Sequence, residues 1–144
     1  MIKNLYVFSS SNKIDKKRIH KLVGSLRKDL NFSIESLYIN LIDNDSIQKI
    51  NQDYLHHNYA TDVITFNYSG NNTAIDGEIF ISLEESELNA RKYKVSLSHE
   101  LKRLVIHGIL HLMGYKDIGL KDRIKMKKKE NNLLNKYNFS LLRK

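Results

Sequence analysis

Several kinds of residue and segment are missing from this chain of 144 residues, and each absence excludes a class of protein or site. The chain has no cysteine, so disulfides are impossible, and a metal ion would have to be held by histidine and carboxylate side chains. No run of about 18 apolar residues is present, which excludes a membrane-spanning helix. The first ten residues, MIKNLYVFSS, lack the apolar stretch and cleavage site of a secretory signal. We therefore expect a cytoplasmic protein without a membrane segment.

Proline is also absent, whereas lysine, asparagine and isoleucine are abundant, which is typical of biased codon usage. The net charge is +8 and the pI is about 9.6. Basic residues gather at positions 13–21 and again at positions 121–129. A basic surface favours a phosphate-rich partner such as nucleic acid, but codon bias and solvated helix faces explain the same charges.

The spacing of apolar residues predicts one domain, residues 1–144, with an α+β or mixed α/β fold. Strands are expected at residues 5–8, 37–41, 63–68 and 78–82, with the last two antiparallel. The first helix is expected to start at Asn12 and to run to residue 30. The second is expected after Asp43 or Asn44, and the third after Ser82. The fourth is expected from Ser96 or Ser98 to residue 113, and the fifth over residues 120–136. The result is a small sheet of about four strands packed with about five helices. The helix that ends near residue 113 is strongly apolar and is expected in the core.

That apolar helix carries the most informative motif of the chain. His107 and His111 are four residues apart, which places them on one face of a helix. Gly114 can end the helix in a left-handed conformation, and Asp117 then follows three residues later. Two histidines, one carboxylate and an open position form the ligand set of a catalytic zinc site. The alternative is a pair of core histidines, but imidazoles buried in an apolar helix need polar partners.

One zinc ion per chain, held by His107, His111 and Asp117, would lower the pKa of a bound water towards about 7. Hydrolysis of a phosphodiester, a peptide or another amide is the natural reaction class. The spacing resembles that of metzincin proteases, in which a glutamate that acts as general base follows the first histidine. Gly108 occupies that position here, which weakens the hypothesis of a metalloendopeptidase.

The same segment is similar to the signature of one particular family. Residues 107–115, HGILHLMGY, resemble the signature of the YbeY family of bacterial endoribonucleases. Residues 50–54, INQDY, and residues 61–66, TDVITF, resemble the family's asparagine-containing helix and its Thr-Asp-Val-Leu-Ser-Phe strand. Residues 76–81, DGEIFI, resemble the adjacent strand. These segments follow the family's order and cover about residues 37–117.

The resemblance implies a single-strand-specific, zinc-dependent endoribonuclease with a small mixed α/β fold. It also implies a role in ribosome biogenesis and in ribosomal RNA processing, including maturation of the 3′ end of small-subunit rRNA. The expected partners are ribosomal RNA and the small ribosomal subunit, with ribosomal or assembly-factor proteins as further partners. A non-catalytic RNA-binding assembly factor is the remaining alternative. The metal used in the cell, the general base, the attacking group, the cleavage site and the oligomeric state stay open.

Two positions depart from the family pattern. The usual third ligand is a histidine, and Asp117 is expected to take that role in this chain. Leu55 stands where the family has an arginine thought to contact RNA, and His56, His57 or Lys116 are candidates to replace its charge.

Two further carboxylates are candidate catalytic residues. Glu78 stands where the family has an aspartate near the site, so it either orients a ligand histidine or is a plain surface residue at a strand end. Glu100 lies seven residues before His107 on the same helical face. It is either a general base or supporting group, or the ion-pair partner of Arg103. Thr61 and Asp62 are candidates to line the cleft.

Overall fold

Strands and helices alternate along most of the chain, and the last three elements are helices. A computed structural model describes residues 1–144. The elements are β1 (Leu5–Ser9), α1 (Lys16–Leu30), β2 (Ser33–Ile42), α2 (Asn44–Leu55), β3 (Val63–Asn67), β4 (Ala74–Ser82), α3 (Leu83–Tyr93), α4 (Leu97–Leu112) and α5 (Leu120–Leu134). The predicted mixed α/β class, with a four-stranded sheet and five helices, is confirmed.

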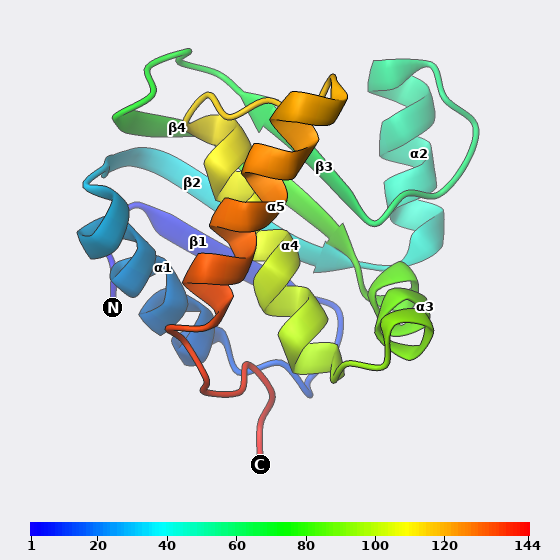
Figure 1. The fold of residues 1–144 in the computed structure, drawn as a ribbon. Helices are drawn as coiled ribbons and strands as arrows, with labels where there is room; N and C mark the ends of the chain where they lie inside the picture. The colour runs from blue at the N-terminus through cyan, green and yellow to red at the C-terminus, as the bar shows by residue number, and fades with distance from the viewer.

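The four strands form one sheet in the order β1-β2-β4-β3. β1 pairs with β2 and β2 pairs with β4 in parallel, whereas β3 and β4 are antiparallel, as predicted for the last two strands. Helices α1, α4 and α5 lie in front of the sheet in Figure 1, and α2 lies at the edge formed by β3. The two faces of the sheet therefore have different surroundings.

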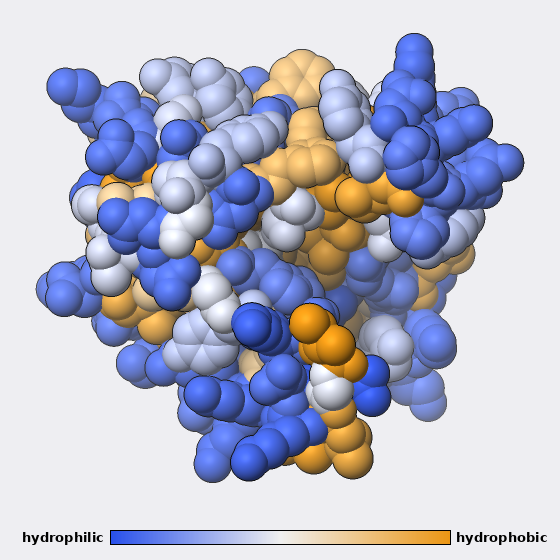
Figure 2. Space-filling model, turned by 90° about the horizontal axis from the view of Figure 1, so that it is seen from above, coloured by the Kyte–Doolittle hydropathy of each residue, from blue (hydrophilic) through white to orange (hydrophobic).

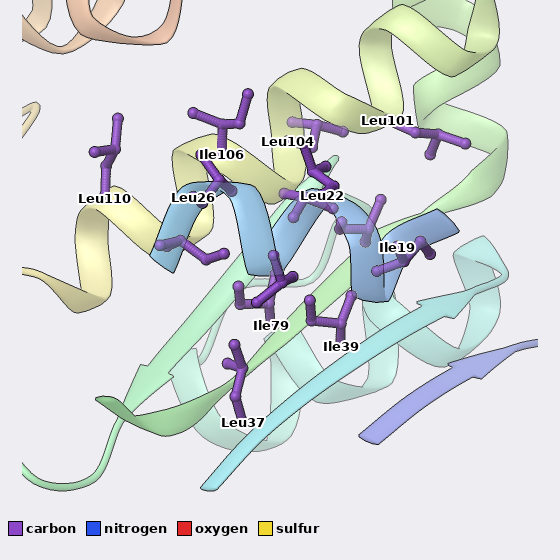
Figure 3. Close-up of a cluster of buried hydrophobic side chains, with 14 of the residues drawn as sticks. Ile19, Leu22, Leu26, Leu37, Ile39, Ile79, Leu101, Leu104, Ile106 and Leu110 are labelled. Atoms are coloured by element: carbon purple, nitrogen blue, oxygen red, sulfur yellow. The ribbon is translucent and has the colours of Figure 1, made fainter. Parts of the chain in front are cut away.

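The main core lies between the sheet and the helices α1 and α4. Side chains alternate along a strand, so Leu37, Ile39 and Leu41 of β2 point to this core and are fully buried. Figure 3 shows Ile39 and Ile79 of the sheet facing Leu22 of α1, with α4 beside them. A smaller cluster of Ile42, Ile47 and Ile64 packs α2 against the opposite face. Burial of these apolar surfaces is the main stabilising contribution to the fold.

Polar residues before the helices fix where they begin. The side chains of Asp43, Ser82 and Ser96 accept hydrogen bonds from backbone N–H groups in the first turns of α2, α3 and α4, which leaves fewer unsatisfied donors there. The start of α1 at Asn12 was predicted wrongly, because Asp15 is the N-cap residue. Residues before Asp15 are held by the C-terminal segment, since Ile14 forms a β-bridge with Leu142.

Helix α4 is the central helix of the molecule, as predicted. Most of its residues are buried, and two glycines bring it close to the sheet. A Cβ atom on Gly108 would lie 2.8 Å from the Cδ1 atom of Ile79, and one on Gly77 would lie 2.8 Å from a methyl group of Leu112. The helix therefore presents its remaining face, with His107 and His111, towards α5 and the loops. None of the helices is both long enough and apolar enough to span a membrane.

Candidate metal centre

The end of α4 and the loop after it bring three donor atoms together. The Nε2 atoms of His107 and His111 are 3.0 Å apart. Gly114 has a φ of 97°, so the chain turns back after the helix and carries Asp117 to the two rings. The Oδ2 atom of Asp117 lies 3.6 Å from His107 Nε2 and 3.3 Å from His111 Nε2. The predicted group of His107, His111 and Asp117 therefore exists as a triangle of donor atoms that can hold a metal ion.

The size of this triangle fits a tetrahedral ion. Ligand atoms at about 2.0–2.1 Å from zinc, arranged at tetrahedral angles, are roughly 3.3 Å apart. The three observed separations lie on both sides of that value. The Asp117 side chain is 42% exposed, so the centre is accessible to a substrate. The donor set is nitrogen and oxygen only, as a chain without cysteine requires.

A carboxylate from another helix orients His107. The Oε2 atom of Glu130, on α5, lies 2.5 Å from His107 Nδ1, and the Glu130 side chain is only 5% exposed. The Nδ1–H group donates to this carboxylate, which leaves the lone pair of Nε2 free to bind a metal. Helix α5 thus contributes to the site without contributing a ligand.

Arg103 links the buried carboxylates of Glu100 and Glu130 with the partly exposed carboxylate of Asp62. Its guanidinium group donates to both oxygens of Glu100, at 2.9 and 2.6 Å, and lies 3.5 Å from Glu130 and 3.7 Å from Asp62. Hydrogen bonds to Glu100 are the largest cause of the raised pKa of Arg103, so the arginine stays charged. A charged group buried away from water is costly unless it has such a partner.

Two hollows adjoin the donor triangle. One of about 280 Å³ is lined by Thr61, Asp62, Val63 and Thr65 together with the three residues of the triangle. The other, of about 400 Å³, includes His107 and Asp117. Arg103 in its lining pairs with Glu100 and Glu130, whereas the cations Arg123 and Lys127 belong to no ion pair. Cations next to the metal centre suit a negatively charged substrate such as a phosphodiester backbone.

Comparison with known proteins agrees with these features. The family model described as Endoribonuclease YbeY matches residues 5–138. The Endoribonuclease YbeY of Chlorobium limicola is 40% identical over 134 residues, which are 92% of either chain. The chain belongs to the YbeY family. The YbeY of Chlorobaculum tepidum is 45% identical over 102 residues, 71% of this chain and 72% of that one.

The YbeY fold is also found among solved structures. The solution structure of TM1509 from Thermotoga maritima matches with a TM-score of 0.66 and 26% identity, over 91% of this chain and 87% of that chain. Membership of the YbeY family makes this chain a hydrolase that acts on RNA, and neither the metalloendopeptidase nor the non-catalytic assembly factor is favoured.

The two candidate carboxylates lie in different places within the YbeY fold. Glu100 forms the ion pair with Arg103 that was the alternative to a catalytic role, and its side chain is only 2% exposed. Glu78 does not orient either histidine. Its neighbours Gly77 and Ile79 face α4, so alternation along β4 directs Glu78 to the opposite face, where it accepts a hydrogen bond from Tyr68.

The departure from the family pattern at Leu55 lies away from the two hollows at the donor triangle. Leu55 is the last residue of α2 and 43% exposed, and it lines neither hollow at the metal centre. Of the candidates to replace the charge, Lys116 lies in the loop beside Asp117 and lines a small surface hollow with Asp122 and Lys125. His56 and His57 follow α2, as Leu55 does.

Sequence reasoning missed Glu130 and the linking role of Arg103. A signal for Glu130 was present, because Met126, Glu130 and Leu133 follow helical spacing and are all buried on one side of α5. An acidic residue within such an apolar stripe indicates a buried polar partner. Which partner it has depends on how α5 packs against α4.

Proposed function

We propose that this chain is a zinc-dependent endoribonuclease that cleaves single-stranded regions of ribosomal RNA precursors, including the 3′ end of small-subunit rRNA. The observation that carries the proposal is the triangle of His107, His111 and Asp117 beside a hollow bordered by cations. The triangle suits a zinc ion, and the cations suit an RNA backbone. Family membership supplies the reaction class.

The residues of the chain have separate tasks in this proposal. His107, His111 and Asp117 would hold the ion. A bound zinc ion would act as a Lewis acid and lower the pKa of a water molecule to about 7. Glu130 keeps the His107 ring in the tautomer that presents Nε2. Arg123 and Lys127 bind phosphate groups of the strand and so place the scissile phosphodiester at the donor triangle.

The proposal extends to the whole chain and its setting. Residues 1–144 act as one metal-dependent hydrolase domain, because α5 near the C-terminus supports ligands on α4 and β3 borders the cleft. The substrate is ribosomal RNA within the small ribosomal subunit or its precursors, and ribosomal or assembly-factor proteins are partners. The place of action is the cytoplasm, where bacterial ribosomes are assembled.

The test compares cleavage of a single-stranded rRNA precursor by zinc-loaded wild type and by His111→Ala. We expect cleavage by wild type and its loss in His111→Ala, because that variant removes one of three donor atoms. Glu87→Gln is the control, since Glu87 is exposed on α3 and lies outside the triangle and its hollows, and this variant should retain both zinc and cleavage. No cutting by wild type, or equal cutting by wild type and His111→Ala, contradicts the proposal. A 2′,3′-cyclic phosphate on the product identifies the RNA 2′-hydroxyl as the attacking group.

A further inference from the structure

A second pocket lies on the face of the sheet that is turned away from α4. It has a volume of about 270 Å³ and is lined by Ile50 and Tyr54 of α2 and by Phe66, Tyr68, Glu78 and Phe80 of the two antiparallel strands and the turn between them. Figure 2 shows the molecule from above, with a group of hydrophobic residues exposed between hydrophilic side chains. None of the metal ligands lines this pocket, so it is separate from the catalytic centre.

Aromatic rings form its walls. The ring of Phe66 meets the ring of Tyr54 edge to face, with centroids 5.6 Å apart and planes at 71°. It meets Phe80 in the same way, at 5.9 Å and 82°. At such angles the edge of one ring points to the face of the next. The face of an aromatic ring carries negative charge and attracts cations.

Glu78 is the one charged residue in the lining. Its carboxylate accepts a hydrogen bond from the hydroxyl of Tyr68 at 2.9 Å and a long one from Asn40 Nδ2 at 3.4 Å. Burial and this carboxylate raise the pKa of Tyr68 to about 12, so the hydroxyl remains a donor at neutral pH. A carboxylate has about four acceptor positions, so Glu78 can accept further bonds. It belongs to none of the ion pairs of the molecule.

We propose that this pocket binds the guanidinium group of an arginine side chain presented by a protein partner. A guanidinium group is planar, stacks on aromatic faces and donates two parallel hydrogen bonds to a carboxylate. The pocket offers these two kinds of contact and supplies no cation of its own. Its volume lies just below the usual range for small-molecule sites, which fits a single side chain. An RNA strand fits less well, because Glu78 repels phosphate and no basic residue lines the pocket.

The surface next to the pocket supports a protein as the source of the arginine. Tyr38 is in register with Glu78 on one side and with Tyr6 on the other. The rings of Tyr6 and Tyr38 stack at 4.8 Å, and both residues are more than two-fifths exposed. Phe8, on the same face of β1, is 53% exposed. Exposed aromatic residues beside an arginine pocket are typical of the central part of a protein interface.

The experiment uses the whole chain labelled with ¹⁵N and follows its amide resonances by NMR. The probe is the peptide acetyl-Gly-Arg-Gly-amide, and acetyl-Gly-Gln-Gly-amide and guanosine monophosphate are the comparisons. We expect saturable shifts at Tyr68, Glu78 and Phe80 with the arginine peptide alone. Equal shifts with the glutamine peptide overturn the proposal. Saturation by guanosine monophosphate without saturation by the arginine peptide also overturns it and identifies a nucleobase site instead.

Two variants test the two kinds of contact separately. Glu78→Gln keeps an acceptor for Tyr68 and removes the charge, so the arginine peptide should bind at least about tenfold more weakly. Tyr54→Leu leaves the carboxylate and removes one aromatic wall, and should weaken binding by about threefold or more. Glu87→Gln, on the exposed side of α3, is the matched charge control and should bind as wild type does. Unchanged binding in Glu78→Gln, with an unchanged melting temperature, overturns the proposal.

Discussion

At Glu130, one carboxylate serves two partners from a neighbouring helix. Its Oε2 atom lies 2.5 Å from His107 Nδ1, and its Oε1 atom lies 3.5 Å from Arg103 Nη1. A carboxylate behind a metal-binding histidine fixes the orientation of the ring and makes its other nitrogen more basic. Glu130 therefore belongs to the centre, although it contributes no donor atom to the triangle.

We expect Glu130→Gln to weaken zinc binding by about 10- to 100-fold, the usual effect of removing such a supporting group. Competition with a zinc-binding dye measures the affinity. Glu87→Gln also neutralises a glutamate but lies on exposed α3, and its zinc affinity should equal that of wild type. An unchanged affinity in Glu130→Gln would show that His107 needs no carboxylate for its orientation.

His20 makes stability depend on pH. Burial lowers the pKa of His20 below its usual value, and the backbone N–H of Ile2 donates to its Nδ1 atom. His20 therefore takes up a proton at a higher pH in the unfolded chain than in the folded chain. The free energy of unfolding then falls as the pH drops through about 6.5, because protonation of His20 favours the unfolded chain. We expect the melting temperature of wild type to fall between about pH 8 and about pH 5 by more than that of His20→Gln. Parallel curves for the two proteins would contradict this role.

At the scale of single residues, the sequence predicts what is local and misses what is tertiary. His107, His111, Gly114 and Asp117 lie on one helix and its following turn, so their spacing alone places them together. Glu78 was a candidate because it stands where the family has an aspartate near the site, and a plain surface residue was the alternative. Alternation along β4 puts it on the other face of the sheet, and this could be known only after the register and packing of the strand were known.

The contact between α4 and β4 depends on the absence of a side chain at Gly108. A methyl group there would meet three carbon atoms of Ile79, the nearest at 2.8 Å, and Ile79 is fully buried. Alanine favours a helix over glycine by about 1 kcal/mol, but crowding in a packed core costs about 1–3 kcal/mol. We expect Gly108→Ala to lower the free energy of unfolding by about 1 kcal/mol, as measured by urea denaturation.

A second substitution checks that the crowding occurs at Ile79. Ile79→Val removes the Cδ1 atom and alone costs about 0.5–1.5 kcal/mol. The double variant Gly108→Ala/Ile79→Val should be more stable than the sum of the two single effects predicts. Additive effects would mean that the new methyl group is accommodated elsewhere.

At the scale of elements, the order of strands and helices and the antiparallel last pair follow from apolar spacing and turn residues. Helix starts were predictable where the capping residue acts alone, as at Asp43, Ser82 and Ser96. At α1 the predicted N-cap residue was Asn12, but the observed N-cap residue is Asp15, because Ile14 just before it pairs with Leu142 of the C-terminal segment. A contact with a segment far away in the sequence cannot be predicted from the residues around the helix start.

Across the whole molecule, the charge of +8 is divided between separate basic surfaces, and only one of them adjoins the metal centre. Arg123 and Lys127 border the hollow that includes His107 and Asp117. Lys17 and Lys21 border another hollow, formed by α1 and the C-terminal segment. The position of each cation decides whether it can contact a substrate at the donor triangle, and amino-acid composition alone does not give that position.

We expect the affinity for single-stranded RNA to fall with salt, and Arg123→Ala/Lys127→Ala to make this dependence less steep. Each phosphate contact contributes about 0.7 to the slope of log affinity against log salt concentration, so loss of two contacts changes the slope by roughly 1.4. Lys17→Ala/Lys21→Ala removes the same net charge and should leave the slope unchanged. Equal changes in both variants would indicate that net charge, rather than a defined path, holds the RNA. Fluorescence anisotropy at several salt concentrations gives both slopes.

The support of His107 by Glu130 also sets an order of events during synthesis. The three ligands lie within residues 107–117, whereas Glu130 comes 23 residues after His107. A chain leaves the ribosome from its N-terminus, so the ligands emerge before the carboxylate that orients one of them. In the proposed site, the ion would be held less tightly until α5 has emerged and docked. If the chain acts as proposed, its full nuclease activity would therefore appear only after residue 130 has left the ribosome that makes it.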